Sequence, residues 1–496
     1  MNTSRIASPL RAALRHAVTL CAILLLPAAR SVAPAQTVGP FDRQAWLEDL
    51  GEARAALSAK YAGLEWEVIE RGVDLSAIFA TAEDRIGHAN NDWEARRAFE
   101  KLMDRFGDKH VLVRWPSTKP PERSLGGLSC DGMGYTTEMQ AEPLTAFLPG
   151  FVPVPLPVGN VFPTGVVARG LHRVGMIKIP VFMAQGFPSL CELAIDDIHI
   201  DRTRTCDEDC QGRIAGRAEY VLTTQFEAAI EAVKAAGANA LLIDIAGNGG
   251  GTEWVGAASR MVTHVRLEGL RNYFVKGPLW LRHFAQQKHD LENARRTARR
   301  ADRELLTHLI EQVSEREREA REVCDAGALW EGTQPSCRRL GDAFFSTGLL
   351  SSADPGALRA KPWASLVFSP LQYPYREGVW RGPLLVVVDG RSASAAEHFA
   401  AELQDNHAAV IVGSPTAGAG CGHTDGGTPT RLSHSGGILE VSDCVRIRLN
   451  GQNLANGVQP DLLVGFRESD SAKRRAFLLN EKLDIALDAA DALGDH

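Results

Sequence analysis

The chain has 496 residues, of which 45% are apolar and 23% are charged, and it carries a net charge of −7. This composition is that of a folded globular protein, and the length predicts roughly two to four domains with an ample hydrophobic core. The mild negative charge argues against nucleic acids and anionic membrane surfaces as partners.

The first 35 residues have the pattern of a secretory signal peptide. Three arginines precede an apolar stretch at 17–26, and a small-x-small cleavage site follows at 33–35. The apolar stretch is too short to cross a bilayer, and no other stretch is long enough to do so. We therefore expect an exported protein, periplasmic or extracellular, without a membrane span.

Cysteine usage agrees with export. Cys21 lies in the signal peptide, and the eight cysteines that remain are an even number, which is typical of disulfides in an exported chain. The sequence alone leaves the connectivity open. The local pairs that we expect are Cys324 with Cys337 and Cys421 with Cys444.

Two further cysteines, Cys206 and Cys210, flank three acidic residues and superficially resemble a metal site. A zinc site needs a second Cys/His pair at suitable spacing, and we find none. A disulfide-stapled loop is therefore the favoured interpretation, and we expect no metal or other cofactor.

Hydrophobic periodicity predicts helices in the N-terminal region 36–115, ending near Gly107, before a short strand at 111–113. The Pro/Gly-rich segment 116–173 is expected to be an irregular connection.

An α/β core is predicted over 174–265 and 381–470. A strand at 174–179, a helix at 222–236 and a buried strand at 241–245 with a glycine turn are typical of such a core. We expect an inserted loop at 190–215, where three cysteines and many charges gather.

The core is interrupted by a charged helical insertion at 266–380. Its stretch 284–323 is rich in Arg, Glu and Ala, which predicts a long solvated helix or hairpin. Residues 471–496 are expected to form a C-terminal helix.

A candidate nucleophile follows the apolar run 384–388. This run ends at Asp389-Gly390 in a serine-rich turn, directly before a helix-compatible stretch. A hydroxyl at a helix N-terminus lies beside unpaired N–H groups that can stabilise a developing negative charge. Ser394 is our candidate, and the alternative is that Ser392 or Ser394 only caps the helix.

Four segments in this order carry a resemblance to a known family: 106–110, 248–251, Ser394 with Gln404-Asp405, and 457–461. The chain resembles the C-terminal processing (tail-specific) serine proteases and their tricorn-like relatives. The resemblance implies a crotonase-like (ClpP-like) layered α/β core with an N-terminal helical domain. It covers about 90–115, 174–182, 236–260 and 384–465, which is under half of the chain.

The family's strand-end motif D-x-x-x-N-x-G-G looks like Asp244, Asn248, Gly250 and Gly251. In the family a glycine of this turn supplies an oxyanion N–H, which points to Gly250. Glycine suits the role because its backbone can approach a tetrahedral oxygen closely at positive φ.

The family's spacing before the Gln-Asp pair selects Ser394 rather than Ser392 as the nucleophile. The N–H of Ala395 is then the second expected oxyanion donor.

The general base departs from the lysine-dependent branch of the family. The T-x-G-K segment of that branch matches residues 416–419, where Ala419 takes the lysine position, so a Ser/Lys dyad is excluded. The tricorn-like motif L-G-x-x-H looks like residues 106–110 and makes His110 the expected general base. The alternative is that His110 only caps the helix end. The rival imidazoles are His423, ranked second, His398 and His407.

The third catalytic member stays open. In the tricorn-like branch a glutamate orients the histidine, and the matching position holds Leu454. A displaced partner is expected among Gln452, Asn453, Asn456, Glu440 and Asp443.

The favoured interpretation is an exported serine peptidase in which Ser394 attacks the acyl carbon of a peptide or protein substrate and His110 transfers the proton. The alternative is a catalytically inactive member of the same fold that acts as a binding or scaffolding protein. A crotonase-like acyl-thioester enzyme is less compatible with an exported, disulfide-bearing chain.

Overall fold

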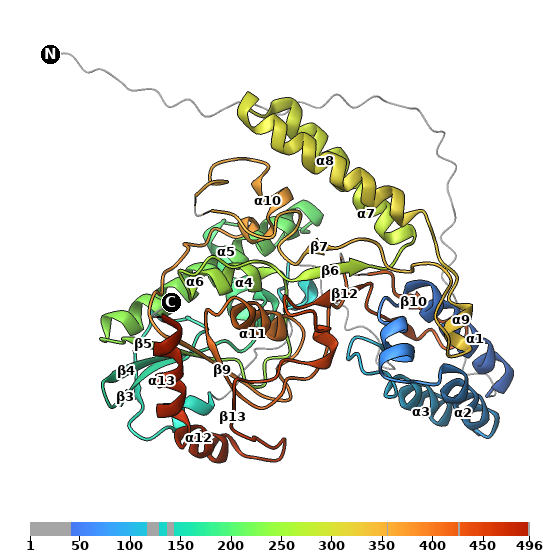
Figure 1. Cartoon of the computed structure of the whole chain (residues 1–496), viewed down its shortest axis with the longest axis horizontal. Helices are drawn as coiled ribbons and strands as arrows, with labels where there is room; N and C mark the ends of the chain where they lie inside the picture. The colour runs from blue at the N-terminus through green and yellow to red at the C-terminus, as the bar shows by residue number, and fades with distance from the viewer. Residues whose placement is uncertain (1–40, 117–127, 136–142, 355, 425–426, 495–496) are drawn as a thin grey trace. The chain divides into compact units, whose positions relative to one another are not determined.

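The structure is a computed structural model that describes residues 41–116, 128–135, 143–354, 356–424 and 427–494 (Figure 1). The expected signal peptide and its cleavage site lie outside the described residues. Residues Arg43–His496 form one compact unit. The domain boundaries that we expect within this unit stay predictions.

The N-terminal region is helical, as expected. Its elements are α1 (Arg43–Lys60), a π-helical turn η1 (Trp66–Glu70), α2 (Leu75–Gly87) and α3 (Asp92–Met103). The side chains of Asp74 and Asn91 accept backbone N–H groups at the starts of α2 and α3. These N-caps explain where the two helices begin.

A seven-stranded mixed sheet forms the centre of the fold. Its strands in spatial order are β13 (Leu462–Leu463), β9 (Val410–Gly413), β8 (Leu384–Val388), β5 (Ala240–Asp244), β4 (His172–Lys178), β3 (Thr164–Arg169) and β2 (Val152–Pro153). The strands from β13 to β4 pair in parallel, whereas β4, β3 and β2 pair antiparallel. The parallel strands β5 and β8 are buried throughout, as strands covered on both faces must be.

Helices cover both faces of this sheet, because alternate strand residues point to opposite sides. Leu241 and Ile243 belong to a core with α4 (Pro188–Asp197), α5 (Glu208–Ala235), α6 (Trp254–Met261) and α11 (Ala395–Asp405). Ala240 and Leu242 pack instead with η3 (Leu144–Phe147), α12 (Ala472–Asn480) and α13 (Leu483–Gly494). The mixed α/β layering expected from the sequence is therefore confirmed.

Three local expectations were wrong. The segment 116–173 is not wholly irregular, because it carries β2, β3 and the first residues of β4 in the central sheet. The segment 190–215 is mostly helix rather than loop, because α5 begins at Glu208, where the Asp207 side chain accepts the Cys210 N–H. Its charges lie on the solvent side of α4 and α5. The C-terminal segment holds two helices, α12 and α13, rather than one.

The insertion contains a helical hairpin, α7 (Pro278–Thr297) and α8 (Arg300–Ala320), which run side by side (Figure 1). The hairpin is less solvated than expected, because one stripe of each helix is buried, including Trp280, Phe284, Leu306 and Leu309. Other elements of the insertion are β6 (Arg271–Phe274), α9 (Gly327–Trp330), β7 (Phe344–Phe345), α10 (Ala364–Val367) and η5 (Ser369–Gln372).

Small sheets and turns join distant parts of the chain. One sheet has the order β1 (Leu112–Arg114), β11 (Ile438–Glu440) and β10 (Thr430–Arg431). Another has the order β12 (Cys444–Ile447), β6 and β7. The remaining short turns are η2 (Asp131–Met133), η4 (Ala184–Gly186) and η6 (Leu454–Asn456). Pairing of β1 with β11 brings the end of the N-terminal helical region to the C-terminal half.

The cysteines of the described residues pair as Cys130–Cys191, Cys206–Cys210, Cys324–Cys337 and Cys421–Cys444. Both expected local pairs are confirmed, as is the stapled loop at 206–210. None of the described helices is both long enough and apolar enough to span a membrane.

Candidate active site

Two turns meet at the carboxyl edge of the central sheet. Strands β5 and β8 are parallel neighbours with Asp244 opposite Val387, so the turns that follow them lie side by side. The Ala393 N–H donates to the Asn248 carbonyl at 3.0 Å, and the Gly247 N–H donates to Asp389 Oδ1 at 2.8 Å. The glycine turn and the serine turn are thus joined directly.

Ser394 stands at the N-cap of α11 in a strained backbone conformation, with φ 54° and ψ −115°. Such a conformation persists only when its surroundings impose it, and it is common at functional sites. The Ser394 N–H donates to Glu397 Oε2 at 2.9 Å. Ser392, in contrast, is fully buried, and its hydroxyl donates to the Ile245 carbonyl at 2.9 Å. Ser392 therefore holds the turn together, and Ser394, which is half-buried, is the more accessible residue of the pair.

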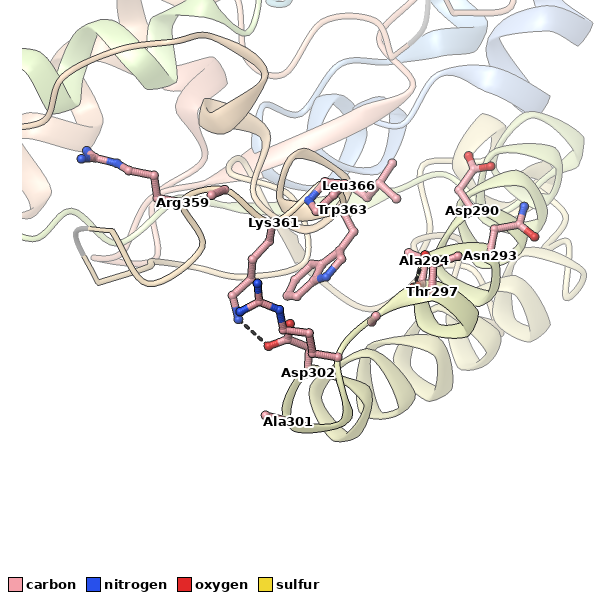
Figure 2. A pocket seen from close by; sticks show the side chains of 14 residues that line it. Asp290, Asn293, Ala294, Thr297, Ala301, Asp302, Arg359, Lys361, Trp363 and Leu366 are labelled. Carbon is pink, nitrogen blue, oxygen red and sulfur yellow. Dashed lines mark hydrogen bonds and ion pairs between the residues drawn. The ribbon is translucent and has the colours of Figure 1, made fainter. Parts of the chain in front are cut away.

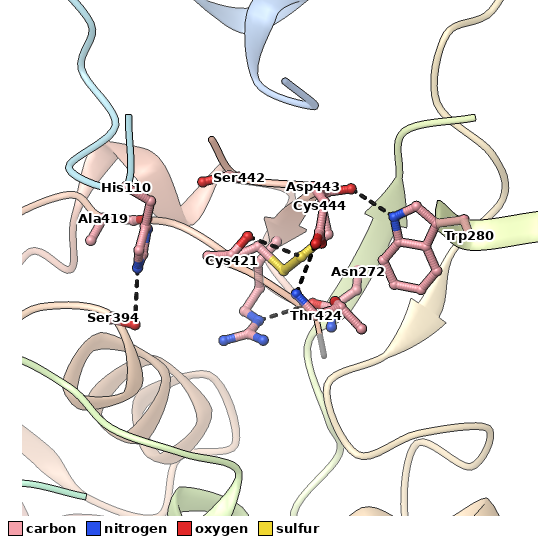
Figure 3. Close-up of a disulfide and its surroundings, with 12 residues drawn as sticks. His110, Asn272, Trp280, Ser394, Ala419, Cys421, Thr424, Ser442, Asp443 and Cys444 are labelled. Carbon is pink, nitrogen blue, oxygen red and sulfur yellow. Dashed lines mark hydrogen bonds between the residues drawn. A yellow bond between two sulfur atoms is a disulfide. The ribbon is translucent and has the colours of Figure 1, made fainter. Parts of the chain in front are cut away.

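The His110 imidazole faces this hydroxyl. Its Nε2 atom lies 3.3 Å from Ser394 Oγ, although 284 residues separate the two (Figure 3). The segment that carries His110 is held by the buried Glu67, which accepts the Gly107 N–H at 2.6 Å. Gly422 packs against the ring, and a Cβ atom there would lie 3.1 Å from Nε2.

Asp108 is the acidic neighbour that sequence analysis missed. Its Oδ1 atom lies 3.2 Å from His110 Nδ1, and it also accepts the His110 backbone N–H at 2.9 Å. The other oxygen accepts the Ser442 hydroxyl at 2.5 Å, and the side chain is 5% exposed. The spacing Asp-x-His in the quoted segment was a signal for this pair.

The Nδ1 atom of His110 also contacts the backbone carbonyl of Ala419. Burial lowers the pKa of the imidazole. The hydrogen bond and charge of Asp108, the Ala419 carbonyl and the charge of Glu397 raise this pKa by more, so the net pKa lies above its ordinary value. The site therefore favours the imidazolium form that proton transfer produces.

Both expected oxyanion donors lie beside Ser394. Gly250 has φ 114°, and a Cβ atom there would lie 2.7 Å from Ser394 Cβ and 3.1 Å from the Ala395 nitrogen. The Gly250 N–H donates to Asn248 Oδ1 at 2.9 Å. Ala395 is the first residue of α11, where a backbone N–H has no partner within the helix.

The rival histidines differ in position. His398 is 1% exposed, and burial, followed by the charges of Arg446 and Arg260, lowers its pKa well below the ordinary value. The ring centroid of His423 lies 5.5 Å from that of His110. Burial lowers the pKa of His423, and the neighbouring His110 lowers it further.

Some of the residues that we expected to orient the histidine bind other groups instead. Glu440 pairs with Arg114 on β1, at 2.8 Å. Asp443 accepts the Thr424 N–H at 2.8 Å, and the Asn453 side chain accepts the Ala455 N–H at 3.0 Å.

The remaining motif pieces meet near the end of α11. The Gln404 amide donates to Asp461 Oδ1 at 2.7 Å and to the Gln459 carbonyl at 3.0 Å. Gln404 therefore supports the 457–461 segment, whereas Asp405 accepts from Arg448 and from the Leu449 N–H.

A cavity of about 890 Å³ lies away from these residues, between the α7–α8 hairpin and the segment 359–366 (Figure 2). Trp363 and the Lys361–Asp302 ion pair line it, and none of the Ser394 site residues does. Within the described residues, no group of three or more His, Cys, Asp or Glu side chains is arranged to hold a metal ion.

Comparison with known structures shows a similar fold. The crystal structure of mature CPAF is similar to the chain with a TM-score of 0.57 at 16% identity, and the match covers 91% of this chain and 98% of that one. The structure of mature CPAF complexed with lactacystin gives a TM-score of 0.56, also at 16% identity, with 91% and 99% covered. At this identity the likeness concerns the fold alone.

A Chlamydia pneumoniae protein, CPj1016/CpB1054, is 31% identical over 128 residues, which are 25% of this chain. The match spans only 20% of that protein's length. The model of peptidase family S41 matches residues 173–464, which is more than half of the chain and includes the glycine turn, Ser394 and the 457–461 segment. The chain therefore belongs to peptidase family S41, a family of serine-type peptidases.

Proposed function

We propose that the protein hydrolyses peptide bonds with Ser394 as nucleophile and His110 as general base, without a Ser/Lys dyad. The observation that carries this proposal is the 3.3 Å separation of His110 Nε2 and Ser394 Oγ. A serine hydroxyl needs such a base to attack an acyl carbon at neutral pH. The contact argues against the alternative of an inactive binding protein.

In the proposed reaction, Ser394 Oγ attacks the acyl carbon while its proton passes to His110 Nε2. The imidazolium then returns this proton to the leaving amine, and water releases the acyl group by the same path. We assign Asp108 as the third member, because its carboxylate holds Nδ1–H and stabilises the imidazolium.

The proposed oxyanion donors are Ala395 and Gly250. The Ala395 N–H is available at the helix start, and the helix dipole favours negative charge there. The Gly250 N–H is bonded to Asn248 in the free enzyme, so it would be shared with the oxyanion as the tetrahedral intermediate forms.

Finer features belong to the same proposal. We propose a crotonase-like core, a peptide or protein substrate, no nucleic-acid partner, and export after removal of the signal peptide. The four disulfides of the described residues support an oxidising compartment.

Labelling with a fluorophosphonate tests the proposal. We expect the probe to modify Ser394, and neither the Ser394→Ala nor the His110→Ala variant to be labelled. His423→Ala should keep most of the labelling and of the acylation by a substrate ester. Loss of activity in His423→Ala with retention in His110→Ala would reverse the base assignment, and an unlabelled wild-type protein would favour the inactive alternative.

A further inference from the structure

The loop 414–420, which follows β9, supplies a main-chain oxygen to the catalytic histidine. Ala419 is 2% exposed, and its carbonyl contacts His110 Nδ1. A carbonyl oxygen can only accept a hydrogen bond, so this contact requires the proton on Nδ1 and leaves Nε2 free to accept the proton of Ser394. The loop therefore acts together with Asp108, which also accepts from Nδ1–H, to leave Nε2 facing the nucleophile.

One buried carboxylate connects this loop to the nucleophile. Glu397 is fully buried on the first turn of α11. It accepts the Thr416 hydroxyl at 2.6 Å, the Gly418 and Ala419 N–H groups at 2.7 Å each, and the Ser394 N–H at 2.9 Å. Burial raises the pKa of Glu397, and the four hydrogen bonds lower it only in part, so the net pKa lies above its ordinary value. Three of the donors are backbone N–H groups, which cannot accept, and this pattern fits the ionised carboxylate.

The far side of the loop is held as well. The Val458 N–H donates to the Thr416 hydroxyl oxygen at 2.7 Å. Gly418 has φ 77°, and a Cβ atom there would lie 2.6 Å from the Ala455 carbonyl oxygen. The loop is thus fixed between Glu397 on one side and the 454–458 turn on the other.

We propose that Glu397 is a positioning residue for the reaction, because it fixes the 416–419 loop so that the Ala419 carbonyl orients His110 toward Ser394. This inference rests on the proposed roles of Ser394 and His110. The loop that holds a lysine in the lysine-dependent relatives here acts through its backbone. The negative charge of Glu397 also favours the imidazolium form of His110.

The main test is Glu397→Gln, which keeps the size of the side chain but removes the charge and one acceptor oxygen. We expect kcat for a substrate ester to fall on the order of 10²-fold with little change in KM, short of the ~10⁴-fold loss that a wrong tautomer causes. The acid limb of the kcat/KM profile should also move to lower pH, because a charge that raises the pKa of His110 is lost.

Glu402→Gln is the matched control. Glu402 lies on the same helix, is also fully buried, and bonds Ser259 and Arg260 rather than the loop. We expect this variant to lower Tm without moving the acid limb. The inference is overturned if folded Glu397→Gln keeps the wild-type kcat and the wild-type acid limb of the kcat/KM profile. It is also overturned if the kcat and the acid limb of Glu397→Gln equal those of Glu402→Gln.

Thr416→Val covers the case in which Glu397→Gln does not fold. It removes one donor to Glu397 but keeps the charge. We therefore expect a smaller fall in kcat and no shift in the acid limb of the kcat/KM profile. Thr416→Ser, which keeps the hydroxyl, should resemble wild type. An unchanged kcat in folded Thr416→Val overturns the inference. Fluorophosphonate labelling of the wild-type protein separates the two proposals. If Ser394 is labelled and the loop variants keep full activity, the positioning role of Glu397 is wrong but the proposed peptidase function is not.

Discussion

At the scale of single residues, the environment of His110 supports the proposed peptidase site, which holds neither a lysine at position 419 nor a glutamate at position 454. The imidazole contacts Ser394 through one nitrogen and both Asp108 and the Ala419 carbonyl through the other. Asp108 is itself held by the Ser442 hydroxyl. The ring is therefore oriented by several independent contacts rather than by one acidic partner.

Asp108→Asn is expected to weaken the enzyme and to shift its pH profile. The raised pKa of His110 means that the base stays protonated, and inactive, up to a pH above its ordinary value of ~6.5. Removing the Asp108 charge lowers this pKa, so the acid limb of kcat/KM should move to lower pH while the rate falls on the order of 10²- to 10⁴-fold.

Ser442→Ala serves as the graded control for Asp108, because it removes one donor but leaves the carboxylate. We expect a loss of about 10-fold, smaller than that of Asp108→Asn. An acid limb for Asp108→Asn at or above the wild-type pH would contradict the assignment of Asp108.

Gly250→Ala is expected to abolish most activity while the protein stays folded. The added methyl group would lie 2.7 Å from Ser394 Cβ and 3.0 Å from the Ala393 carbonyl, at a φ of 114° that L-residues rarely adopt. We expect kcat/KM to fall at least ~10²-fold, as for loss of an oxyanion donor.

Gly249→Ala is the neighbouring control, because a Cβ atom there meets nothing within 4 Å. Steady-state kinetics of both variants checks the prediction. Equal activity of the two variants would show that Gly250 is not needed beside the nucleophile.

At the scale of elements, the site depends on three connections that end near one another. The turn after β5, the turn after β8 and the segment before β1 supply Gly250, Ser394 and His110. The disulfide Cys421–Cys444 then joins the loop after Ala419 to β12 (Figure 3). Gly422, next to Cys421, packs against the His110 ring.

Replacing both Cys421 and Cys444 with serine should therefore impair catalysis as well as stability. The bridge spans 23 residues, so its loss should cost about 3 kcal/mol of unfolding free energy. We expect kcat/KM to fall about 10-fold in addition, as for loss of a supporting contact.

The bridge Cys324–Cys337, which spans 13 residues in the insertion, is the matched control. Its replacement should lower stability by a similar amount and leave kcat/KM close to wild type. Denaturant unfolding and ester hydrolysis measure the two effects separately, and equal kinetics for both double variants would refute a catalytic role of the Cys421–Cys444 bridge.

At the scale of the whole molecule, the N-terminal helices are bound to the C-terminal half that carries Ser394. Asp49 on α1 is fully buried and accepts the His434 and Ser435 N–H groups at 2.8 Å each. Trp46 packs edge-on against both His434 and Trp115. The region that contains His110 is thus attached through α1 as well as through β1.

Asp49→Ala should therefore reduce activity, although Asp49 does not contact His110 or Ser394. It leaves two N–H groups without their acceptor, which costs about 1–3 kcal/mol each when they stay buried. We expect a lower Tm and a lower kcat/KM, because the His110 segment is held less firmly. Glu52→Ala, which removes a more exposed acceptor of the Ser433 N–H, should change both quantities little, and thermal unfolding with ester kinetics checks the pair.

The sequence by itself predicted the α/β layering, the local disulfides and, from the turn before a helix start, Ser394 as a candidate nucleophile. These predictions follow from periodicity, turn residues and spacing, which act over short stretches of chain. His110, Gly250 and Ala395 became candidates through the resemblance to the protease family. Asp108 also had a local signal, because it lies two residues before His110.

Tertiary structure alone decided how these segments meet. His110 and Ser394 are 284 residues apart, so only folding brings them into contact. The Ala419 carbonyl and most of the groups that Glu397 binds act through backbone atoms, which have no side-chain signal in the sequence. Every residue has a carbonyl, so no side-chain pattern marks the one that orients a histidine. Similarly, the many charged residues of α4, α5 and the hairpin helices led us to predict a loop and a solvated hairpin. Each of these helices has one apolar stripe, which is buried only because neighbouring elements pack against it.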